Sequence, residues 1–515
     1  MQTSTLEYLE RGALRHSPGK TAIIDGDRHW SFAALAERAQ GIAALIIGRG
    51  IGTHHAVAVY LPKSAGVIAA DLGVLYSGNV YMNLDVKAPA QRTRNIVAHI
   101  GTVAIITTRA LSRQLIDAGV SADHLLLIEL DTEGQGEPVA RDEGALARVR
   151  RQVLDVDPMC IINTSGSTGT PKGVAISHRS TIDFVDWAIG TFGFDGTERL
   201  GFLSPVFFDH FTFELNLCLA TGATLVIISD PLPSFPARLV DFIRDHEVNF
   251  IFWVPSIMTT IANQGLLDSM ALPALTRVWF AGEVFPMKQL NRWRRAFPGA
   301  DFVNLYGPTE ASVDCTYFVV DREFGDDDPL PIGTPCRNTD VLVLTSDNTR
   351  AGAGDQGELC IRGTSLALGY WNDPDRTAQA FVQNPLQRHY PETIYRTGDL
   401  ASVNDRGELM FLGRRDFQVK HMGYRIELLE IEHQILSIPG IANACVVYNA
   451  PRREITLFYQ PVGELTPAAI RQELSDILPK YMLPTAFHRL AELPRNPNGK
   501  IDRQALAAAI GETPS

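Results

Sequence analysis

The chain lacks the features that mark membrane, secreted and metal-binding proteins. Its longest apolar runs, such as residues 223–228, are far shorter than the roughly 20 residues that span a bilayer. The N-terminus has no basic stretch followed by an apolar one, so no signal peptide is expected. The six cysteines are scattered without a Cys-x-x-Cys pair, and no His, Cys and Asp residues stand at metal-ligand spacing. We therefore expect a cytoplasmic protein with reduced thiols and no membrane insertion.

The chain also has fewer positively charged than negatively charged residues. With 46 Lys and Arg against 58 Asp and Glu, the formal net charge is −12, which argues against a nucleic-acid partner. The 515 residues exceed the roughly 100–200 residues of a typical domain, so we expect more than one folding unit. A hydrophobic content of 45% is typical of a soluble globular enzyme.

A loop rich in small residues is the most informative segment. Residues 164–173 read Thr-Ser-Gly-Ser-Thr-Gly-Thr-Pro-Lys-Gly and follow the apolar, strand-like residues 159–162. Glycines permit turns that other residues avoid, and the N–H groups and hydroxyls of such a loop can surround an anion. The spacing differs from the Walker A pattern, so a P-loop NTPase is not expected. The predicted phosphate-binding residues are Thr164, Ser165, Gly166, Ser167, Thr168 and Gly169, with the charge of Lys172.

This loop resembles the phosphate loop of the adenylate-forming superfamily, which contains acyl-CoA synthetases, luciferases and the adenylation domains of nonribosomal peptide synthetases. Further segments resemble other motifs of that family, in the family's order. They are residues 304–310 (Asn-Leu-Tyr-Gly-Pro-Thr-Glu), 357–359 with 369–371, 395–400 (Tyr-Arg-Thr-Gly-Asp-Leu), 413–420 (Gly-Arg-Arg-Asp-Phe-Gln-Val-Lys) and 498–502 (Asn-Gly-Lys-Ile-Asp). Because the motifs cover nearly the whole chain, the sequence is identified as a member of this superfamily.

The resemblance implies a reaction that uses ATP and Mg²⁺. A substrate carboxylate attacks the α-phosphorus and pyrophosphate leaves, so the protein must position two anions and neutralise the phosphates. Carried over from the family, Lys172 acts on the β- and γ-phosphates, Glu310 holds the magnesium ion, and Lys500 bridges the carboxylate and the α-phosphate. The expected nucleotide-binding residues are Asn304, Tyr306, Gly307, Thr309, Asp399 and Arg414. Of these, Tyr306 is expected to stack on adenine, and Asp399 to accept hydrogen bonds from the ribose hydroxyls.

The family then passes the acyl group to a thiol, either coenzyme A or the phosphopantetheine arm of a carrier protein. Lys500 and the thiol channel cannot both be well placed in one arrangement, and the family rotates its small C-terminal domain about a hinge. The resemblance puts this hinge at Asp416 and assigns the position of Lys420 to the second half-reaction. We accordingly expect an adenylation core, residues 1–415, and a mobile lid, residues 416–515, that carries Lys500.

An aspartate in apolar surroundings indicates which kind of acid is activated. Phe208-Asp209 resembles a segment of the amino-acid-activating branch, where the aspartate holds the substrate ammonium group. A carboxylate among several phenylalanines needs a cationic partner or a local hydrogen bond. The family's pocket positions carried over onto this chain are Asp209, His210, Phe213, Ser256, Trp279, Ala281, Gly282, Leu305, Val313 and Asp314.

Several substrates fit these positions. The bulky Phe213 and Trp279 favour a small side chain, such as that of alanine, serine or glycine. Asp314 can accept a hydrogen bond from a hydroxyl or a second amine, or pair with His210, and a β-amino acid is a further alternative. Residues 280–286 and 416–430 are similar to those of D-alanine–carrier-protein ligases, which supports a small amino acid without fixing its stereochemistry.

The periodicity predicts an α/β fold with a second, α+β unit. Strand-like runs alternate with helical stretches, which is typical of helix-covered mixed sheets. Residues 21–32 are predicted to form a hairpin that turns at Asp25-Gly26, and residues 33–47 a helix. Short alternating strands over residues 316–412 suggest an antiparallel, barrel-like subdomain, and the last hundred residues suggest a small α+β domain.

These observations favour a ligase that activates a small amino acid and transfers it to an acyl or peptidyl carrier protein, in a natural-product or cell-envelope pathway. No Gly-Gly-x-Ser carrier motif follows Lys500, so we expect a free-standing enzyme whose carrier comes in trans. The alternatives are an acyl- or aryl-CoA ligase and a β-amino acid–carrier-protein ligase. A catalytically inactive nucleotide-binding or scaffold protein is disfavoured because Lys172, Glu310, Asp399 and Lys500 are all present.

Overall fold

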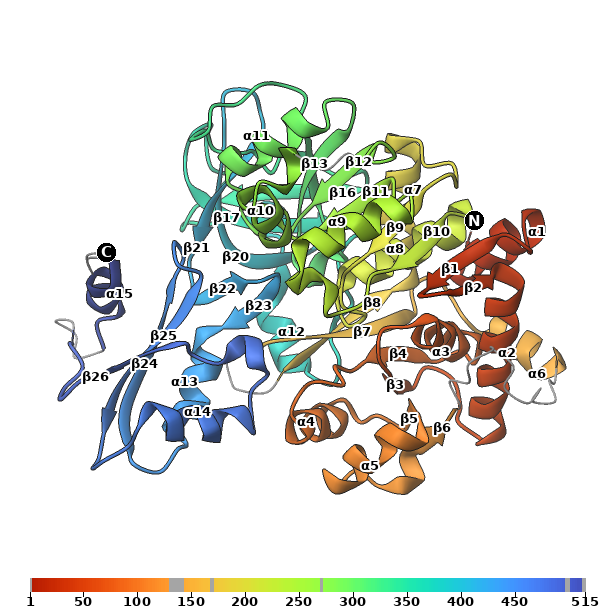
Figure 1. Cartoon of the computed structure of the whole chain (residues 1–515), viewed down its shortest axis with the longest axis horizontal. Helices are drawn as coiled ribbons and strands as arrows, with labels where there is room; N and C mark the ends of the chain where they lie inside the picture. Colours follow the sequence, from red (N-terminus) through yellow and green to blue (C-terminus); the bar gives the residue numbers. More distant parts are fainter. Residues whose placement is uncertain (1, 129–142, 167–170, 269–271, 496–500, 512–515) are drawn as a thin grey trace.

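The computed structural model describes residues 2–128, 143–166, 171–268, 272–495 and 501–511. In this part of the chain two large mixed sheets enclose a layer of helices, and further helices cover their outer faces (Figure 1). A five-stranded antiparallel sheet and a smaller C-terminal unit complete the fold. This arrangement confirms the predicted α/β core with an additional α+β domain.

The first large sheet is parallel in its centre and antiparallel at both edges. Its nine strands in spatial order are β15 (Thr334–Pro335), β14 (Thr316–Val319), β13 (Asp301–Tyr306), β12 (Arg277–Phe280), β11 (Phe250–Trp253), β9 (Arg199–Phe202), β10 (Thr224–Ile227), β1 (Thr21–Asp25) and β2 (Arg28–Ser31). The predicted hairpin is β1–β2, and Gly26 in its turn has a φ of 60°, which glycine adopts without strain.

The second large sheet carries the phosphate loop. Its seven strands in spatial order are β18 (Gly369–Tyr370), β8 (Lys172–Ser177), β7 (Pro158–Thr164), β4 (Val80–Asn83), β3 (Ala56–Tyr60), β5 (Ala104–Thr107) and β6 (Leu125–Leu127). Strands β7 and β8 pair in antiparallel fashion, with Thr164 opposite Lys172. The phosphate loop therefore starts and ends at the same end of this strand pair.

Helices fill the space between the two sheets and cover them outside. The inner layer contains α2 (Phe32–Gly48), α3 (Ala65–Tyr76), α7 (His178–Phe192) and α8 (Asp209–Thr221). The outer layers contain α9 (Pro236–Asp245), α10 (Pro255–Asn263) and α11 (Met287–Ala296) on the first sheet, and α4 (Ala90–Ile100) and α5 (Arg109–Asp117) on the second. Helix α2 begins where predicted because the Ser31 hydroxyl accepts a hydrogen bond from the Ala34 N–H.

The antiparallel subdomain is smaller than the sequence pattern suggests. It consists of β16 (Thr339–Leu344), β17 (Gly357–Gly363), β20 (Thr393–Val403), β19 (Phe381–Gln383) and β21 (Leu409–Arg414), near α12 (Pro374–Ala380). Strands β14 and β15 instead extend the first large sheet, and β18 extends the second. An antiparallel edge on a parallel sheet has the same alternating pattern as a separate antiparallel sheet, which explains the difference.

The C-terminal unit begins after β21. It contains the hairpin β22 (Gln418–His421) and β23 (Tyr424–Glu427), α13 (Leu428–Leu436), the sheet of β24 (Ile441–Asn449), β25 (Glu454–Pro461) and β26 (Ala486–Arg489), and helices α14 (Pro467–Ser475) and α15 (Arg503–Gly511). Helices α13 and α14 cover one face of this sheet, and α15 covers the other (Figure 1). The boundary between residues 415 and 416 stays a prediction.

Candidate active site

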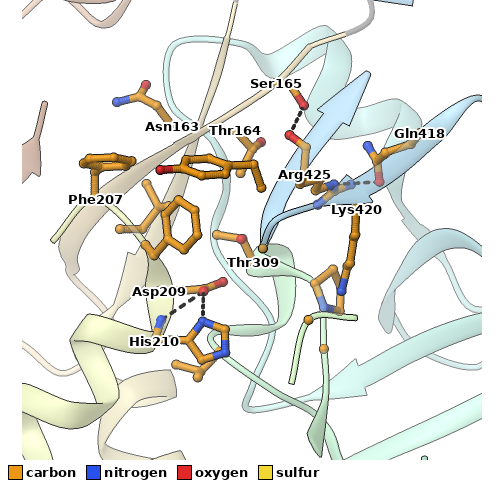
Figure 2. Close-up of a pocket in the computed structure, with 18 of the residues that line it drawn as sticks. Asn163, Thr164, Ser165, Phe207, Asp209, His210, Thr309, Gln418, Lys420 and Arg425 are labelled. Carbon is orange, nitrogen blue, oxygen red and sulfur yellow. Dashed lines mark hydrogen bonds and ion pairs between the residues drawn. The ribbon is translucent and has the colours of Figure 1, made fainter. Parts of the chain in front are cut away.

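One cavity of about 110 Å³ collects many of the sequence-predicted residues. It lies beyond the carboxyl ends of β7, β9, β12 and β13, where α/β folds bind their ligands. The hairpin β22–β23 of the C-terminal unit also lines it (Figure 2). The predicted residues that line it are Thr164, Ser165, Asp209, His210, Gly282, Gly307, Thr309, Val313, Asp314, Asp399 and Arg414.

The other predicted residues lie around this cavity or outside the described residues. Phe213, Ser256, Trp279, Ala281 and Leu305 are buried and do not line it. Asn304 donates a side-chain hydrogen bond to the Pro331 carbonyl oxygen at 2.8 Å. Ser167, Thr168, Gly169 and Lys500 lie outside the described residues, so their roles stay predictions.

Asp209 is the first residue of α8 and has few polar partners among the described residues. It is buried, and one of its carboxylate oxygens accepts a hydrogen bond from the His210 N–H at 2.9 Å. Among the described residues its ion-pair partner is the His210 imidazole at 3.6 Å. Burial lowers the pKa of His210, although Asp209 acts in the opposite direction, so the imidazole is neutral at neutral pH. No lysine or arginine in the described ranges forms an ion pair with Asp209, so a cationic ligand could bind its carboxyl group.

Asp314 lies in the same cavity and is held by a tight loop. A Cβ at Gly307 would lie 2.4 Å from the Asp314 Cα, so only glycine lets the loop after β13 fold back this closely. The preceding Val313 has a φ of 80°, which is strained for a β-branched residue. Burial and the neighbouring Asp209 raise the pKa of Asp314 well above its ordinary value, and Oδ2 finds no hydrogen-bond partner in the part of the chain that the structure describes. The surroundings of Asp314 therefore favour its protonated form, and Oδ2 is available to a ligand.

Glu310 is the carboxylate whose chemistry fits a magnesium ion. It is fully buried and contacts Arg425 at 2.6 Å, Lys172 at 3.5 Å and the Tyr370 hydroxyl at 2.8 Å. Burial alone would raise its pKa, but the charges of Arg425 and Lys172 outweigh that effect and hold the pKa well below its ordinary value. Among the described residues no group of three His, Cys, Asp or Glu side chains could hold a metal. Magnesium would thus need Glu310 together with phosphate oxygens and water.

Tyr306, Asp399 and Arg414 form one hydrogen-bonded group. The Tyr306 hydroxyl donates to one oxygen of Asp399, and the Arg414 guanidinium donates to the other. Arg414 also binds Asp416, at 2.6 Å and 2.7 Å. Asp416 lies between β21 and β22, where the hinge is predicted, and this hinge role stays a prediction.

Several cavity residues were not predicted as site residues. They include Arg92, Phe207, Gln418, Gly423, Tyr424, Arg425 and Tyr481, and five of these seven come from the C-terminal part of the chain. Tyr424 stacks on Tyr481 with ring centroids 3.6 Å apart and meets Phe208 edge-on at 5.1 Å. Gln418, Gly423, Tyr424 and Arg425 stand in segments that resemble the family, but the resemblance does not give their place in the cavity, which depends on how the C-terminal unit packs.

Lys420 also projects into the cavity from β22 (Figure 2). Burial lowers its pKa, whereas the carboxyl groups of Asp399 and Asp314 act in the opposite direction. The residues of the C-terminal unit that line the cavity are Gln418, Lys420, Gly423, Tyr424, Arg425 and Tyr481, and no described residue after Tyr481 lines it. The role of Lys420 in the second half-reaction stays a prediction.

Comparisons with known proteins identify the family of the chain. Residues 9–371 match the AMP-binding enzyme family, and residues 430–500 match the AMP-binding enzyme C-terminal domain. The chain is 32% identical to tyrocidine synthase 1 of Brevibacillus parabrevis, over 95% of this chain but only 43% of that protein. It is 31% identical to an L-proline–[L-prolyl-carrier protein] ligase of Pseudomonas fluorescens, over 97% of this chain and 98% of that ligase.

A solved structure has the same fold. The holo form of PA1221, a nonribosomal peptide synthetase protein containing adenylation and carrier domains, superposes with a TM-score of 0.82 at 26% identity, over 98% of this chain and 84% of that one. Among the described residues no helix is long and apolar enough to cross a membrane. With the family match over most of its length, the chain belongs to the AMP-binding enzymes, the adenylate-forming ligase superfamily.

Proposed function

We propose that the protein activates a small amino acid as its aminoacyl adenylate and transfers the aminoacyl group to the phosphopantetheine thiol of a carrier protein. The observation that carries this proposal is Asp209, a buried carboxylate whose ion-pair partner among the described residues is a neutral histidine. A substrate ammonium group would supply the missing cation. A fatty or aryl acid would leave the charge of Asp209 without one.

The side chain of the substrate would extend toward Asp314. A protonated carboxyl in a small cavity can donate to or accept from a hydroxyl, and it can ionise beside a second ammonium group. Serine and 2,3-diaminopropionate therefore join alanine and glycine as candidates. The bulky Phe213 and Trp279 behind Asp209 support a short side chain.

In the first half-reaction, an oxygen of the substrate carboxylate attacks the α-phosphorus of ATP, the bond to the β-phosphate breaks, and pyrophosphate leaves. Lys172 and the loop after β7 would bind the departing phosphates, and Asp399 would accept hydrogen bonds from the ribose. Magnesium bound at Glu310 would neutralise phosphate charge. Lys500 would bridge the two reacting anions, as the resemblance implies.

In the second half-reaction the carrier thiol attacks the acyl carbon and AMP leaves. Lys420 lies in the cavity where this step would occur. Both the prolyl-carrier-protein ligase and PA1221 are described with carrier proteins, which supports the same class of partner for this chain. The supply of that carrier in trans, the pathway and the cytoplasmic location stay predictions.

ATP–pyrophosphate exchange with a panel of acids tests the proposal. The panel contains L- and D-alanine, serine, glycine, 2,3-diaminopropionate, β-amino acids, and fatty and aryl acids. We expect strong exchange with one small amino acid and background exchange with every acid that lacks an amine. Exchange confined to amine-free acids would contradict the proposal and favour an acyl- or aryl-CoA ligase.

A further inference from the structure

The segment between β9 and α8 forms one wall of the cavity. It comprises residues 203–208, of which Phe207 and Phe208 line the cavity, and Asp209 follows directly. The Phe208 N–H closes a turn in this segment by donating to the Pro205 carbonyl oxygen at 3.0 Å. A segment without a strand ladder or helix depends on other groups to satisfy its buried carbonyl oxygens. Those groups therefore decide where the Asp209 carboxyl group lies.

Two side chains from the second large sheet hold this segment by its carbonyl oxygens. Lys63, which follows β3, donates from its ammonium group to the Leu203 carbonyl oxygen at 2.8 Å. Asn83, the last residue of β4, donates from Nδ2 to the Val206 carbonyl oxygen at 3.1 Å. Val206 precedes Asp209 by three residues. Because β3 and β4 are neighbouring parallel strands, the carboxyl end of the second sheet fixes a segment that belongs to the first sheet.

Asp71 fixes the orientation of the Asn83 side chain. It lies on α3 with no exposed surface, and its Oδ2 accepts a hydrogen bond from Asn83 Nδ2 at 2.8 Å. The same nitrogen therefore faces two oxygens, one of Asp71 and one of Val206. If the amide were turned over, its oxygen would face the Val206 carbonyl oxygen without a proton between them, which is costly in a buried site. The contact with Asp71 thus selects the orientation in which Asn83 is a donor.

The position of Asp71 is an unfavourable one for a carboxyl group. Residues 67–76 of α3 are all buried between the two large sheets, and Oδ1 of Asp71 has no hydrogen-bond partner among the residues that the structure describes. Burial raises the pKa of Asp71 well above its ordinary value. A proton on Oδ1 leaves Oδ2 free to accept from Asn83, so the contact persists in either protonation state. A buried polar group with an unsatisfied atom calls for an explanation, and the orientation of Asn83 provides one.

We propose that Asp71 and Asn83 are positioning residues for amino acid recognition. Asp71 orients the Asn83 amide, and Asn83 holds the Val206 carbonyl, so that Asp209 meets the substrate ammonium group. This inference rests on the proposed function. Neither Asp71 nor Asn83 lines the cavity, so both act through the segment of residues 203–208. The predicted nucleotide-binding residues lie on other segments of the chain, so the effect should be confined to the amino acid.

Pyrophosphate exchange with three variants tests the two roles. Asn83→Leu keeps the shape of the side chain and removes its donor, and it should raise the KM for the preferred amino acid about tenfold. The KM for ATP should stay at its wild-type value. Asp71→Leu should act in the same way, because the Asn83 amide loses the group that orients it. Asp71→Asn keeps an oxygen that can accept from Asn83, so it should retain nearly the wild-type KM for the amino acid.

A double variant and a matched control separate positioning from a general loss of stability. Asp71→Leu/Asn83→Leu should be no worse than Asn83→Leu alone, since Asp71 acts through Asn83. Thr107→Val, on β5 of the same sheet, removes a buried hydrogen bond of 3.0 Å to the Tyr60 carbonyl oxygen. It should lower the melting temperature and leave both KM values unchanged. Hydrogen–deuterium exchange at residues 203–208 should quicken in the two leucine variants and not in Thr107→Val.

The possible contrary results fall on different parts of the inference. A wild-type KM for the amino acid in Asn83→Leu, or an equal rise in the KM for ATP, would overturn the positioning role and leave the proposed function in place. Additive effects of the two leucine substitutions, or an Asp71→Asn variant as impaired as Asp71→Leu, would overturn the role of Asp71. The two Asp71 variants decide the outcome if Asn83→Leu does not fold. Wild-type protein that shows no exchange with any amino acid would overturn the proposed function and this inference with it.

Discussion

Phe213 and Trp279 stack face to face, with ring centroids 5.5 Å apart and ring planes 8° apart. Phe213 follows Asp209 by one helical turn on α8, so the two side chains lie on the same face of the helix. Trp279 is in turn surrounded by Phe192, Phe194, Phe250 and Phe252. These tightly packed aromatic side chains cannot easily move aside, so they should limit the length of the substrate side chain.

Phe213→Ala should broaden the substrate range toward larger side chains, such as those of valine and leucine. Removing a buried phenylalanine lowers the free energy of unfolding by about 3–5 kcal/mol. Phe194→Ala is the matched control, because Phe194 contacts Trp279 but does not lie on α8, the helix that carries Asp209. Denaturant unfolding should show a similar loss for both variants, and pyrophosphate exchange should change its amino acid preference only in Phe213→Ala. A preference that shifts equally in both would contradict the role of Phe213.

Asp209→Ala should abolish amino acid activation without unfolding the protein. Loss of one partner of a buried charge pair costs roughly 2–5 kcal/mol, which corresponds to a fall in kcat/KM of about 30-fold or more. Exposed Asp245→Ala, on α9, serves as the control. The measurement is pyrophosphate exchange with the preferred amino acid and with its amine-free analogue. Unchanged exchange with the amino acid would show that Asp209 does not bind an ammonium group.

Local patterns were enough to predict the β1–β2 hairpin, α2 and most central strands, because turns, helix caps and apolar periodicity depend on residues that are only a few positions apart in the sequence. The motif residues around Asp209, Asp314 and Asp399 likewise meet in one cavity. The pattern could not separate β14, β15 and β18 from the antiparallel subdomain, since edge strands of a mixed sheet alternate in the same way.

The contacts of Arg425 and Glu430 were beyond sequence reasoning for a different reason. Glu430 pairs with Arg92, which lies 338 positions away in the chain, and no periodicity or spacing encodes such a pair. Both residues stand in a segment that resembles a family motif, but a motif gives residue types and not the surface against which they pack. Only the placement of the C-terminal unit brings them to Glu310 and Gly166.

Lys500→Ala and Lys420→Ala should impair different half-reactions. Lys500 is expected to act when the adenylate forms, so its loss should reduce pyrophosphate exchange while transfer from a supplied aminoacyl adenylate to a thiol persists. Lys420 lies in the cavity in the present arrangement, so its loss should reduce transfer and leave exchange near the wild-type rate. Single-turnover measurements of both steps check this division. Equal effects of either variant on both steps would argue against it.

Asp314→Asn should make the protein more stable at neutral pH and less active. Burial raises the pKa of Asp314 in the folded protein well above the value of about 3.9 in an unfolded chain. Between these two values the folded state holds a proton that the unfolded state has lost, so the stability of the wild type falls as pH rises. Asparagine does not titrate, and it keeps the shape of the protonated carboxyl. The stability advantage of the variant should therefore be absent near pH 3 and grow as pH rises toward 7.

The activity of Asp314→Asn should fall where the substrate carries a second ammonium group, because an asparagine side chain cannot ionise beside it. The loss of one hydrogen bond to a buried group costs about 1–3 kcal/mol, or roughly 5- to 150-fold in kcat/KM. Denaturant unfolding between pH 3 and 8 and exchange assays with serine and 2,3-diaminopropionate measure the two effects. A near-total loss with the diamino acid alone would identify an ionised Asp314 paired with a second amine. A stability difference independent of pH would contradict the raised pKa, since a buried carboxyl that ionises in its ordinary range gives no proton linkage above pH 4.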